Sequence, residues 1–338
     1  MVKYPIGMAS FREIRKGGFL YVDKTMYIHQ LVSLGKYFFL SRPRRFGKSL
    51  MISTMESYFR GERELFQGLA IDRLEPEEWI QYPVLRLDFT RGGYNNPDDL
   101  PKFLGKIVDA WEKEYGTSHP DQTPDWRFDK IIHDIYNQTG RQVVILIDEY
   151  DSPIVDSHDN PELEAANRKT LHDFYRVMKA NEDNLKFVFL TGVGKIGQIN
   201  VFSGLNNLKD ISLHPDYSAI CGITTQELLD NFKEGIDKLA EDLEMSPEEA
   251  LAELKNHYDG YHFSQKLIDV YNPFSLANAL FDRSIRDYWF HSGTPTRLVR
   301  EFLKNDWGKP DLEGTQVSGS DLDSGDVLGD NLALTCYY

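Results

Sequence analysis

Cysteine is scarce in this sequence. Only Cys221 and Cys336 occur among the 338 residues, and they lie 115 positions apart. Neither has a metal-ligand partner at short spacing. This excludes a disulfide framework, argues against a zinc site, and is typical of a protein from a reducing compartment.

Long apolar runs are also lacking. No stretch approaches the roughly 18 apolar residues that a membrane-spanning helix needs. The segment Met1–Ser10 has no long apolar core behind a basic start, which argues against a secretory signal. We therefore predict no membrane association and a cytoplasmic location.

Basic residues are fewer than acidic ones. The chain has 38 Lys and Arg against 53 Asp and Glu, a net charge of −15. Such a surface repels nucleic acid, which argues against that partner, and only a local basic site is expected to bind phosphate. Hydrophobic residues still make up 41% of the chain, which excludes a disordered protein.

Short β-type runs alternate with longer helical patterns over the first 215 residues or so. The runs are rich in Val, Ile, Phe and Leu, which is typical of strands buried on both faces of a parallel sheet. The predicted strands are Tyr37–Leu40, Val84–Phe89, Val143–Ile147, Phe187–Leu190 and Ile211–Leu213. The predicted helices are Met26–Leu34, Ser49–Phe59, Asp98–Tyr115, Phe128–Gln138 and Glu162–Ala180. This order predicts an α/β fold with a doubly wound, mainly parallel sheet of about five strands.

The pattern becomes mainly helical from Thr224, a candidate N-cap. Ser246 and Glu249 have the spacing of a capping box. The predicted helices are Gln226–Leu239, a second one from about 246 to 258, Tyr271–Phe281 and Thr296–Leu303. We expect three parts: a core domain over residues 1–223, a helical, lid-like domain over 224–305, and a Gly/Ser/Asp-rich linker with the start of a further domain over 306–338.

The strongest chemical signal is the basic segment RPRRFGKSL, residues 42–50, which lies between the first predicted strand and the next helix. Successive backbone amides at a helix N-terminus bind phosphate, Lys48 would contact the outer phosphates, and the Ser49 hydroxyl would bind Mg²⁺. The usual pattern has a glycine five residues before Gly47, where this sequence has Arg42. The strand–loop–helix order and the local positive charge nevertheless favour a phosphate site over a solvated basic turn. The candidate cradle comprises Pro43, Arg44, Arg45, Phe46, Gly47, Lys48, Ser49 and Leu50.

Polar side chains follow the third and fourth predicted strands. Asp148 and Glu149 come directly after the run VVILI. In phosphoryl-transfer sites an acid at this place holds Mg²⁺, and the next acid polarises the attacking water. We therefore predict Ser49 and Asp148 as metal ligands and Glu149 and Lys48 as catalytic residues. Thr191, after the run FVFL, is a candidate for sensing the γ-phosphate.

Two other patterns carry less weight. Gly192–Gly197 has the spacing of a dinucleotide-binding loop, but no strong helix follows it and Asp210 precedes its strand. Glu253 and Lys255 have nuclease-like spacing, yet they lie in a helical pattern without a matching acidic strand end. We interpret the first as a loop and the second as a solvated helix face.

Several of these motifs together resemble the bacterial AAA-ATPase-like family. They are YVDKT, SRPRRFGKSL, LIDEYDSP, FVFLTGV, FSGLNNLKDISL and HYDGYHF, and the resemblance runs from about Pro5 to Leu303. It implies a P-loop NTPase of the additional-strand class that uses ATP and Mg²⁺. It further implies that Lys48 and Ser49 belong to Walker A, that Asp148 and Glu149 form Walker B, and that Thr191 is a sensor. The segment Tyr21–Thr25 resembles one that packs near adenine.

Members of this family commonly carry a PD-(D/E)XK nuclease-like domain behind the ATPase, and its signature is not found in this sequence. We therefore expect an ATP-hydrolysing module that regulates a C-terminal effector, with ATP and other proteins or a second copy of itself as partners. Two alternatives stay open: a nucleotide switch or scaffold that does not hydrolyse ATP, and a small-molecule kinase.

Overall fold

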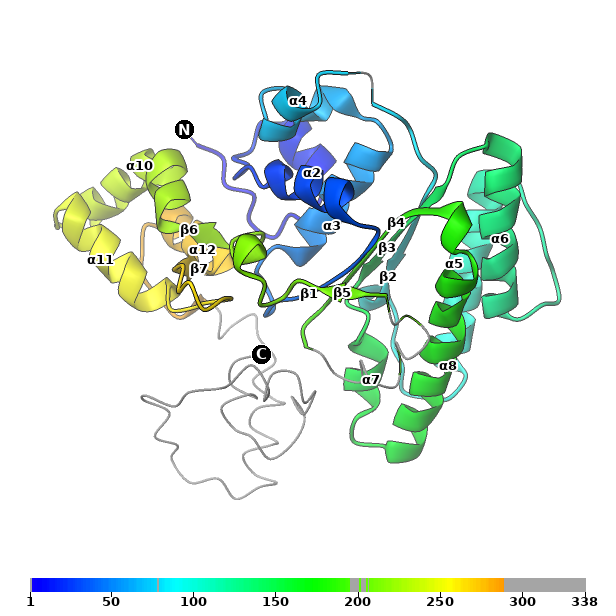
Figure 1. The fold of residues 1–338 in the computed structure, drawn as a ribbon. Helices are drawn as coiled ribbons and strands as arrows, with labels where there is room; N and C mark the ends of the chain where they lie inside the picture. The colour runs from blue at the N-terminus through cyan, green and yellow to red at the C-terminus, as the bar shows by residue number, and fades with distance from the viewer. Residues whose placement is uncertain (1, 78, 195–200, 202–204, 206, 289–338) are drawn as a thin grey trace.

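The structure is a computed structural model that describes residues 2–77, 79–194, 201, 205 and 207–288 (Figure 1). The helix expected at Thr296–Leu303, the linker expected at 306–338 and part of the loop Gly192–Gly197 lie outside these residues. No helix in the described part of the chain combines the length and apolar character that crossing a membrane requires.

The centre of the molecule is a five-stranded sheet in which every strand pair is parallel. The strands are β1 (Tyr37–Ser41), β2 (Val84–Asp88), β3 (Val143–Asp148), β4 (Leu185–Gly192) and β5 (Lys209–Asp210). Their order across the sheet is β2-β3-β4-β1-β5. Strand β4 is thus inserted between β1 and β3, as the additional-strand class requires. The predicted P-loop NTPase fold is confirmed.

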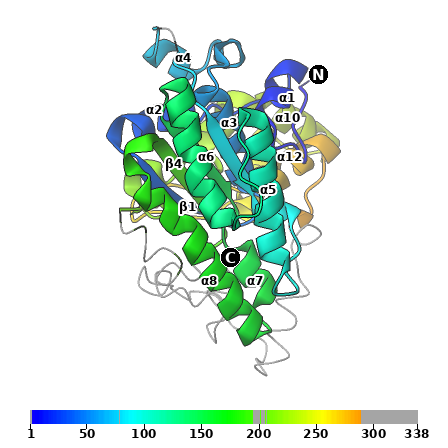
Figure 2. The same cartoon turned by 90° about the vertical axis from the view of Figure 1, so that its right-hand side faces the viewer.

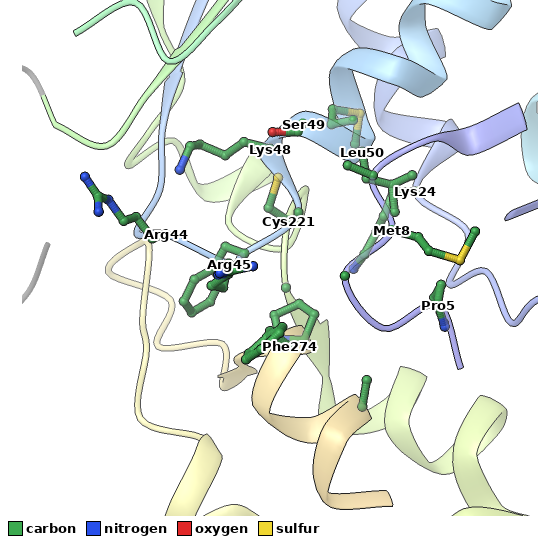
Figure 3. Close-up of a pocket in the computed structure, with 18 of the residues that line it drawn as sticks. Pro5, Met8, Lys24, Arg44, Arg45, Lys48, Ser49, Leu50, Cys221 and Phe274 are labelled. Carbon is green, nitrogen blue, oxygen red and sulfur yellow. The ribbon is translucent and has the colours of Figure 1, made fainter. Parts of the chain in front are cut away.

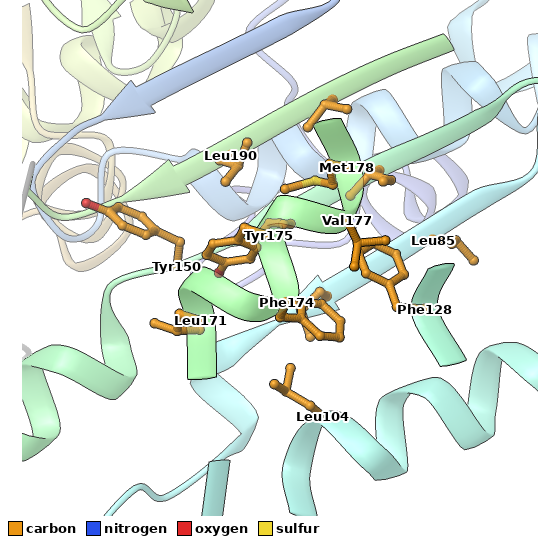
Figure 4. Close-up of a cluster of buried hydrophobic side chains, with 14 of the residues drawn as sticks. Leu85, Leu104, Phe128, Tyr150, Leu171, Phe174, Tyr175, Val177, Met178 and Leu190 are labelled. Carbon is orange, nitrogen blue, oxygen red and sulfur yellow. The ribbon is translucent and has the colours of Figure 1, made fainter. Parts of the chain in front are cut away.

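Helices cover both faces of the sheet because alternate strand residues point in opposite directions. Tyr37 and Phe39 of β1 face one cluster, whereas Phe38 and Leu40 face the other. The first face is covered by α5 (Asp99–Tyr115), α6 (Pro124–Thr139) and α8 (Pro161–Ala180), which Figure 2 shows in front of the sheet. The second face is covered by α1 (Phe11–Gly17), α2 (Thr25–Leu34) and α3 (Lys48–Phe59), with the short α4 (Ala70–Leu74) beside α2. Figure 4 shows the aromatic centre of the first face.

A helical region follows the sheet and lies to one side of it in Figure 1. It consists of α10 (Thr225–Asp242), α11 (Pro247–Tyr258) and α12 (Pro273–Asp282), with a small antiparallel pair of β6 (Ile223–Thr224) and β7 (Val270–Tyr271). Capping boxes begin α10 and α11, at Thr224 with Glu227 and at Ser246 with Glu249. These helices enclose a third apolar cluster, which the N-terminal Tyr4, Leu20 and Val22 join.

Three predicted elements include residues that the structure assigns to something else. The fifth strand is Lys209–Asp210, not Ile211–Leu213, because the chain turns at Asp210: its carboxylate accepts the Ser212 amide at 2.8 Å. Phe89 begins a 3₁₀ turn after β2, since the Asp88 side chain caps it through the Thr90 amide. Tyr271 belongs to β7, and the helix predicted from it begins at Pro273, after the N-cap Asn272.

Candidate functional site

The loop between β1 and α3, which we call the P-loop (residues 42–49), takes a backbone shape that depends on unusual torsions. Gly47 is the N-cap of α3 with φ +96°, a conformation that glycine adopts without a Cβ penalty. Arg45 also has a positive φ, of +70°. These torsions turn the chain around the N-terminus of α3, where backbone amides and the helix dipole favour an anion.

Lys48 lies inside this loop and is 3% exposed. Its Nζ donates to the carbonyl oxygens of Arg42 at 2.8 Å and Pro43 at 3.2 Å. It also forms an ion pair of 3.0 Å with Glu149 Oε1. The structure therefore brings the predicted loop lysine and the predicted acid of the third strand into direct contact, although they are far apart in the sequence.

Asp148 ends β3 at 1% exposure, and two hydroxyl groups hold its carboxylate. Thr191 Oγ1, from β4, donates to Asp148 Oδ1 at 2.7 Å, and the Ser49 side chain is a second hydrogen-bond partner. Burial raises the pKa of Asp148, and these two hydrogen bonds lower it in part. Ser49 and Asp148 are thus adjacent oxygen donors of the kind that Mg²⁺ prefers.

Glu149 directly follows β3 in a left-handed backbone conformation, with φ +51°. Its amide donates to Thr191 Oγ1 at 3.4 Å. Left-handed torsions at residues other than glycine are uncommon, and they cluster at functional sites. The turn directs the Glu149 side chain to Lys48, whereas the Asp148 side chain points to Ser49 and Thr191.

The remaining P-loop side chains differ in where they point. Arg44 and Arg45 are exposed, and Arg45 lies over the Phe274 ring of α12 at 4.7 Å (Figure 3). Phe46 is 1% exposed and contacts Tyr261 and Phe263, at ring distances of 4.7 and 5.4 Å. Pro43 is buried, and its contribution to the loop is the carbonyl that accepts from Lys48.

A cavity of about 490 Å³ opens beside the P-loop (Figure 3). Of the predicted site residues, those lining it are Arg44, Arg45, Phe46, Gly47, Lys48, Ser49, Leu50 and Glu149. The apolar part of the wall comes mainly from the N-terminal segment Pro5–Ala9 with Leu20–Val22, from Ile220–Ile223 and from α12, whereas Thr90, Asp151, Ser152 and Asp156 add polar groups. The volume and the division into a charged end and an apolar end suit a nucleotide.

Sequence reasoning missed several charged residues at this cavity, of which Asp151 and Lys24 are buried. Asp151 is 1% exposed, and its carboxylate accepts from the amides of Val193 and Gly194, each at 3.0 Å. Burial first and the Glu149 charge second raise the pKa of Asp151 to about 7. Lys24, of the YVDKT motif, donates to Ala219 O at 2.8 Å and to Glu227 at 2.6 Å. Asp151 belongs to the motif LIDEYDSP and Lys24 to YVDKT, and no other feature of the sequence marks them as site residues.

The chain is similar to a curated protein, to a solved structure and to a family model. The chain is 36% identical over 342 residues to "Uncharacterized protein in vnfD 5'region" of Azotobacter chroococcum mcd 1, covering 99% of this chain. It spans 63% of the length of that relative. The structure of the Aeropyrum pernix ORC2 protein in ADPNP–ADP complexes is similar at a TM-score of 0.38 and 10% identity, over 95% of this chain and 80% of that one. Because this TM-score is low, the fold assignment depends on the sheet topology alone. A family model described as "Predicted AAA-ATPase" matches residues 5–202, and the chain therefore belongs to the AAA-ATPase-like family.

Proposed function

We propose that this chain binds Mg²⁺–ATP in the cavity beside the P-loop and hydrolyses it. The observation that carries the proposal is the meeting of two predicted pairs: Lys48 contacts Glu149 at 3.0 Å, and Ser49 contacts Asp148. Both contacts occur where β1 and β3 end, at one edge of the sheet. This edge is where open α/β sheets bind their ligands.

The P-loop would hold the phosphates. Its backbone amides at the start of α3 and the side chains of Lys48, Arg44 and Arg45 supply positive charge in an acidic protein. Ser49 and Asp148 fit a Mg²⁺ ion, because such ions take one or two protein oxygens and complete their shell with phosphate oxygens and water. The ion would neutralise charge on the outer phosphates.

Glu149 would act on water. In this structure its carboxylate is paired with Lys48, and ATP phosphate would compete for the same ammonium group. Glu149 is then available to accept a proton from a water molecule as the water oxygen bonds to the γ-phosphorus and the bond to the ADP oxygen breaks. Thr191 would hold Asp148 in place through its 2.7 Å hydrogen bond.

The apolar end of the cavity would receive the adenine. Pro5 and Met8 lie on one side of it and Phe274 on another (Figure 3). Tyr21 and Val22 of the YVDKT motif also line it, which agrees with the expectation that this motif lies near the base. Because Phe274 belongs to α12, the nucleotide would touch the sheet and the helical region at once.

The relative from Azotobacter is longer than this chain, which leaves room for a further domain in proteins of this kind. We propose that the ATPase module regulates such an effector, in the cytoplasm. The helical region, residues 224–288 of the described chain, is the part that would carry the signal. Protein partners or self-association would act through it.

Calorimetry with Mg²⁺–ATP, combined with a phosphate-release assay, tests the proposal. Lys48→Ala removes the charge at the outer phosphates, and we expect binding to weaken by about a hundredfold or more. Glu149→Gln keeps the shape of the side chain, so we expect it to retain ATP and lose turnover. Lys169→Ala is the control, since the side chain of this lysine is 79% exposed and does not line the cavity. Equal ATP affinity in the wild type and Lys48→Ala would contradict the proposal.

A nucleotide-controlled scaffold without turnover is the second candidate. The observation that favours it is the direct contact between Phe46 of the P-loop and Tyr261 of the helical region, which would let bound ATP alone change their packing. ATP binding by the wild type without phosphate release would favour this alternative. The position of Glu149 beside Lys48 favours hydrolysis over a small-molecule kinase, which has no need of a water-polarising acid.

A further inference from the structure

Arg42 stands where phosphate-binding loops of this type usually have glycine. We propose that Arg42 is a positioning residue that anchors the P-loop to residues 212–222 and to Phe263, so that the ATP-binding shape of the loop depends on this anchor. The inference rests on the proposed function, since the loop being positioned is the proposed ATP cradle.

The guanidinium group of Arg42 is buried among backbone carbonyl groups. The residue is 1% exposed. It donates to Ser41 O at 2.8 Å, Ser212 O at 2.6 Å, Tyr217 O at 3.0 Å and Ser218 O at 3.4 Å. Three of these four acceptors lie about 170 residues further along the chain. A planar group with five donors can bridge carbonyls that lie on separate segments, further apart than the three donors of a single ammonium group can reach.

The same guanidinium lies over the Phe263 ring at 4.0 Å, a geometry that adds a cation–π attraction. Phe263 also contacts Phe46, near the other end of the P-loop, at 5.4 Å. The Phe46 carbonyl in turn accepts from the Gly222 amide at 3.1 Å. Both ends of the P-loop therefore contact the same part of the chain, residues 212–222 together with Phe263.

Arg42 does not act on the nucleotide directly. It is absent from the lining of the cavity, to which Arg44 and Arg45 contribute. Its own carbonyl, however, accepts from Lys48 Nζ at 2.8 Å. The side chain thus fixes a backbone position that orients the lysine proposed to bind the outer phosphates. A glycine at this position would match the usual loop pattern, but it would remove the guanidinium donor from the carbonyls of Ser212 and Tyr217 and leave the latter only the Ile220 amide, at 3.2 Å.

The proposal therefore makes an unusual prediction: restoring the usual glycine harms the site. We expect Arg42→Gly to remain folded and to bind Mg²⁺–ATP about tenfold or more weakly than the wild type. The matched control is Arg63→Gly. Arg63 also donates to carbonyls, those of Pro76 and Glu77, and lies near the Trp79 ring at 6.0 Å, but it does not line the cavity. We expect it to lose thermal stability without losing ATP affinity.

Arg42→Lys separates anchoring from charge, and it serves equally if the glycine variant does not fold. It keeps the positive charge, but its single ammonium group cannot reach the separate carbonyls that Arg42 bridges, so we expect weakened ATP binding. Wild-type affinity in Arg42→Lys would show that charge alone is sufficient and would overturn the proposal. Wild-type or tighter affinity in a folded Arg42→Gly would overturn it as well.

Hydrogen exchange without nucleotide distinguishes a failure of this inference from a failure of the proposed function. We expect peptides covering 42–48 and 214–222 to exchange about tenfold faster in Arg42→Gly than in the wild type. Without the anchor, the Phe46 carbonyl that accepts from the Gly222 amide would no longer be held in place. Arg63→Gly should leave these peptides unchanged. If the wild type binds no ATP, the proposed function fails, and this exchange result still decides the anchor. Unchanged exchange in a folded Arg42→Gly or Arg42→Lys would overturn the anchor.

Discussion

The two faces of the sheet serve different purposes. The first face, under α5, α6 and α8, is a closed aromatic and aliphatic layer in which Phe128 and Phe174 stack at 4.5 Å with an angle of 8° between their rings (Figure 4). The cluster of the second face also reaches the P-loop and the chain from Cys221 onward, whereas the first face takes its members outside the sheet and these helices, such as Tyr94 and Tyr150, from earlier in the chain. Phe46 of the P-loop, Cys221, Phe263 and Val270 all join the cluster of the second face.

This difference indicates the route by which a bound nucleotide would affect the helical region. On the second face, the apolar core of the sheet continues through Phe46 into the segment that leads to the helical region. The cation–π contact between Arg42 and Phe263 also connects the P-loop to this segment. Among the described residues, the cluster of the first face and the side chains packed against it end at Leu208, before the helical region begins. A change on the first face is expected to act on stability, and a change on the second face on stability and ATP affinity together.

The largest effect on folding is expected on the first face. Phe174 is 1% exposed, and Phe174→Ala removes a stacked ring, so we expect the free energy of unfolding to fall by about 3–5 kcal/mol. ATP affinity in the folded protein should stay within about twofold, because substitutions at separate sites act independently. Urea unfolding and calorimetry measure the two quantities. A tenfold loss of ATP affinity would show that the faces are not independent.

A smaller effect on folding, with a larger effect on ligand binding, is expected on the second face. Phe263→Leu removes the ring beneath the Arg42 guanidinium and beside Phe46. We expect the free energy of unfolding to fall by about 1–2 kcal/mol, from the repacking and the lost cation–π contact. ATP binding should weaken by about three- to tenfold, through the loop that these contacts hold.

Phe174→Leu is the matched control for this comparison. It makes the same substitution on the first face, where we expect a similar loss of stability and an unchanged ATP affinity. Equal ATP affinity in the two leucine variants would contradict the distinction between the faces.

The charge state of Asp151, three residues after the end of β3, is expected to make stability depend on pH. Its pKa is raised from 3.8 to about 7 by burial and by Glu149, so the folded state keeps a proton that the unfolded state releases. Between these two pKa values the folded state binds more protons, and the Asp151 contribution to stability therefore falls as pH rises, by up to about 1.4 kcal/mol per pH unit. Asp151→Asn does not titrate.

Urea unfolding of the wild type and Asp151→Asn at pH 5, 6 and 7 measures this contribution. We expect Asp151→Asn to gain stability relative to the wild type as pH rises through this window. Parallel pH profiles would show that Asp151 is ionised in the folded protein.

The sheet and the phosphate end of the site were predictable from the sequence because their signals are local. The run VVILI followed by Asp148 and Glu149 indicates a buried strand with acids at its end, and RRFGKS between a strand and a helix indicates a phosphate loop. Parallel strands place their carboxyl ends at one edge of the sheet, and in the structure the two motifs lie together there, with Lys48 3.0 Å from Glu149.

The rest depended on distant partners that no local pattern encodes. Arg42 matched the basic character of the loop and was counted with its phosphate-binding charge, yet its partners are carbonyls about 170 residues away. The fifth strand was misplaced for a related reason: the Ser212 carbonyl accepts from Arg42 and the Ser212 hydroxyl from the Ser41 amide, which ends the strand pairing there. The N-terminal wall of the cavity, Pro5–Ala9, has no sequence signal apart from its position before YVDKT.

The central claim is that ATP bound at the P-loop is felt in the helical region through the second face of the sheet. Hydrogen exchange of the wild type with and without Mg²⁺–ATP tests it most directly, with Lys48→Ala as the non-binding reference. We predict protection by ATP at 42–50 and also at 258–271, the segment that carries Tyr261 and Phe263. Protection at 42–50 with unchanged exchange across 258–271 would contradict the claim and leave the helical region a passive cover.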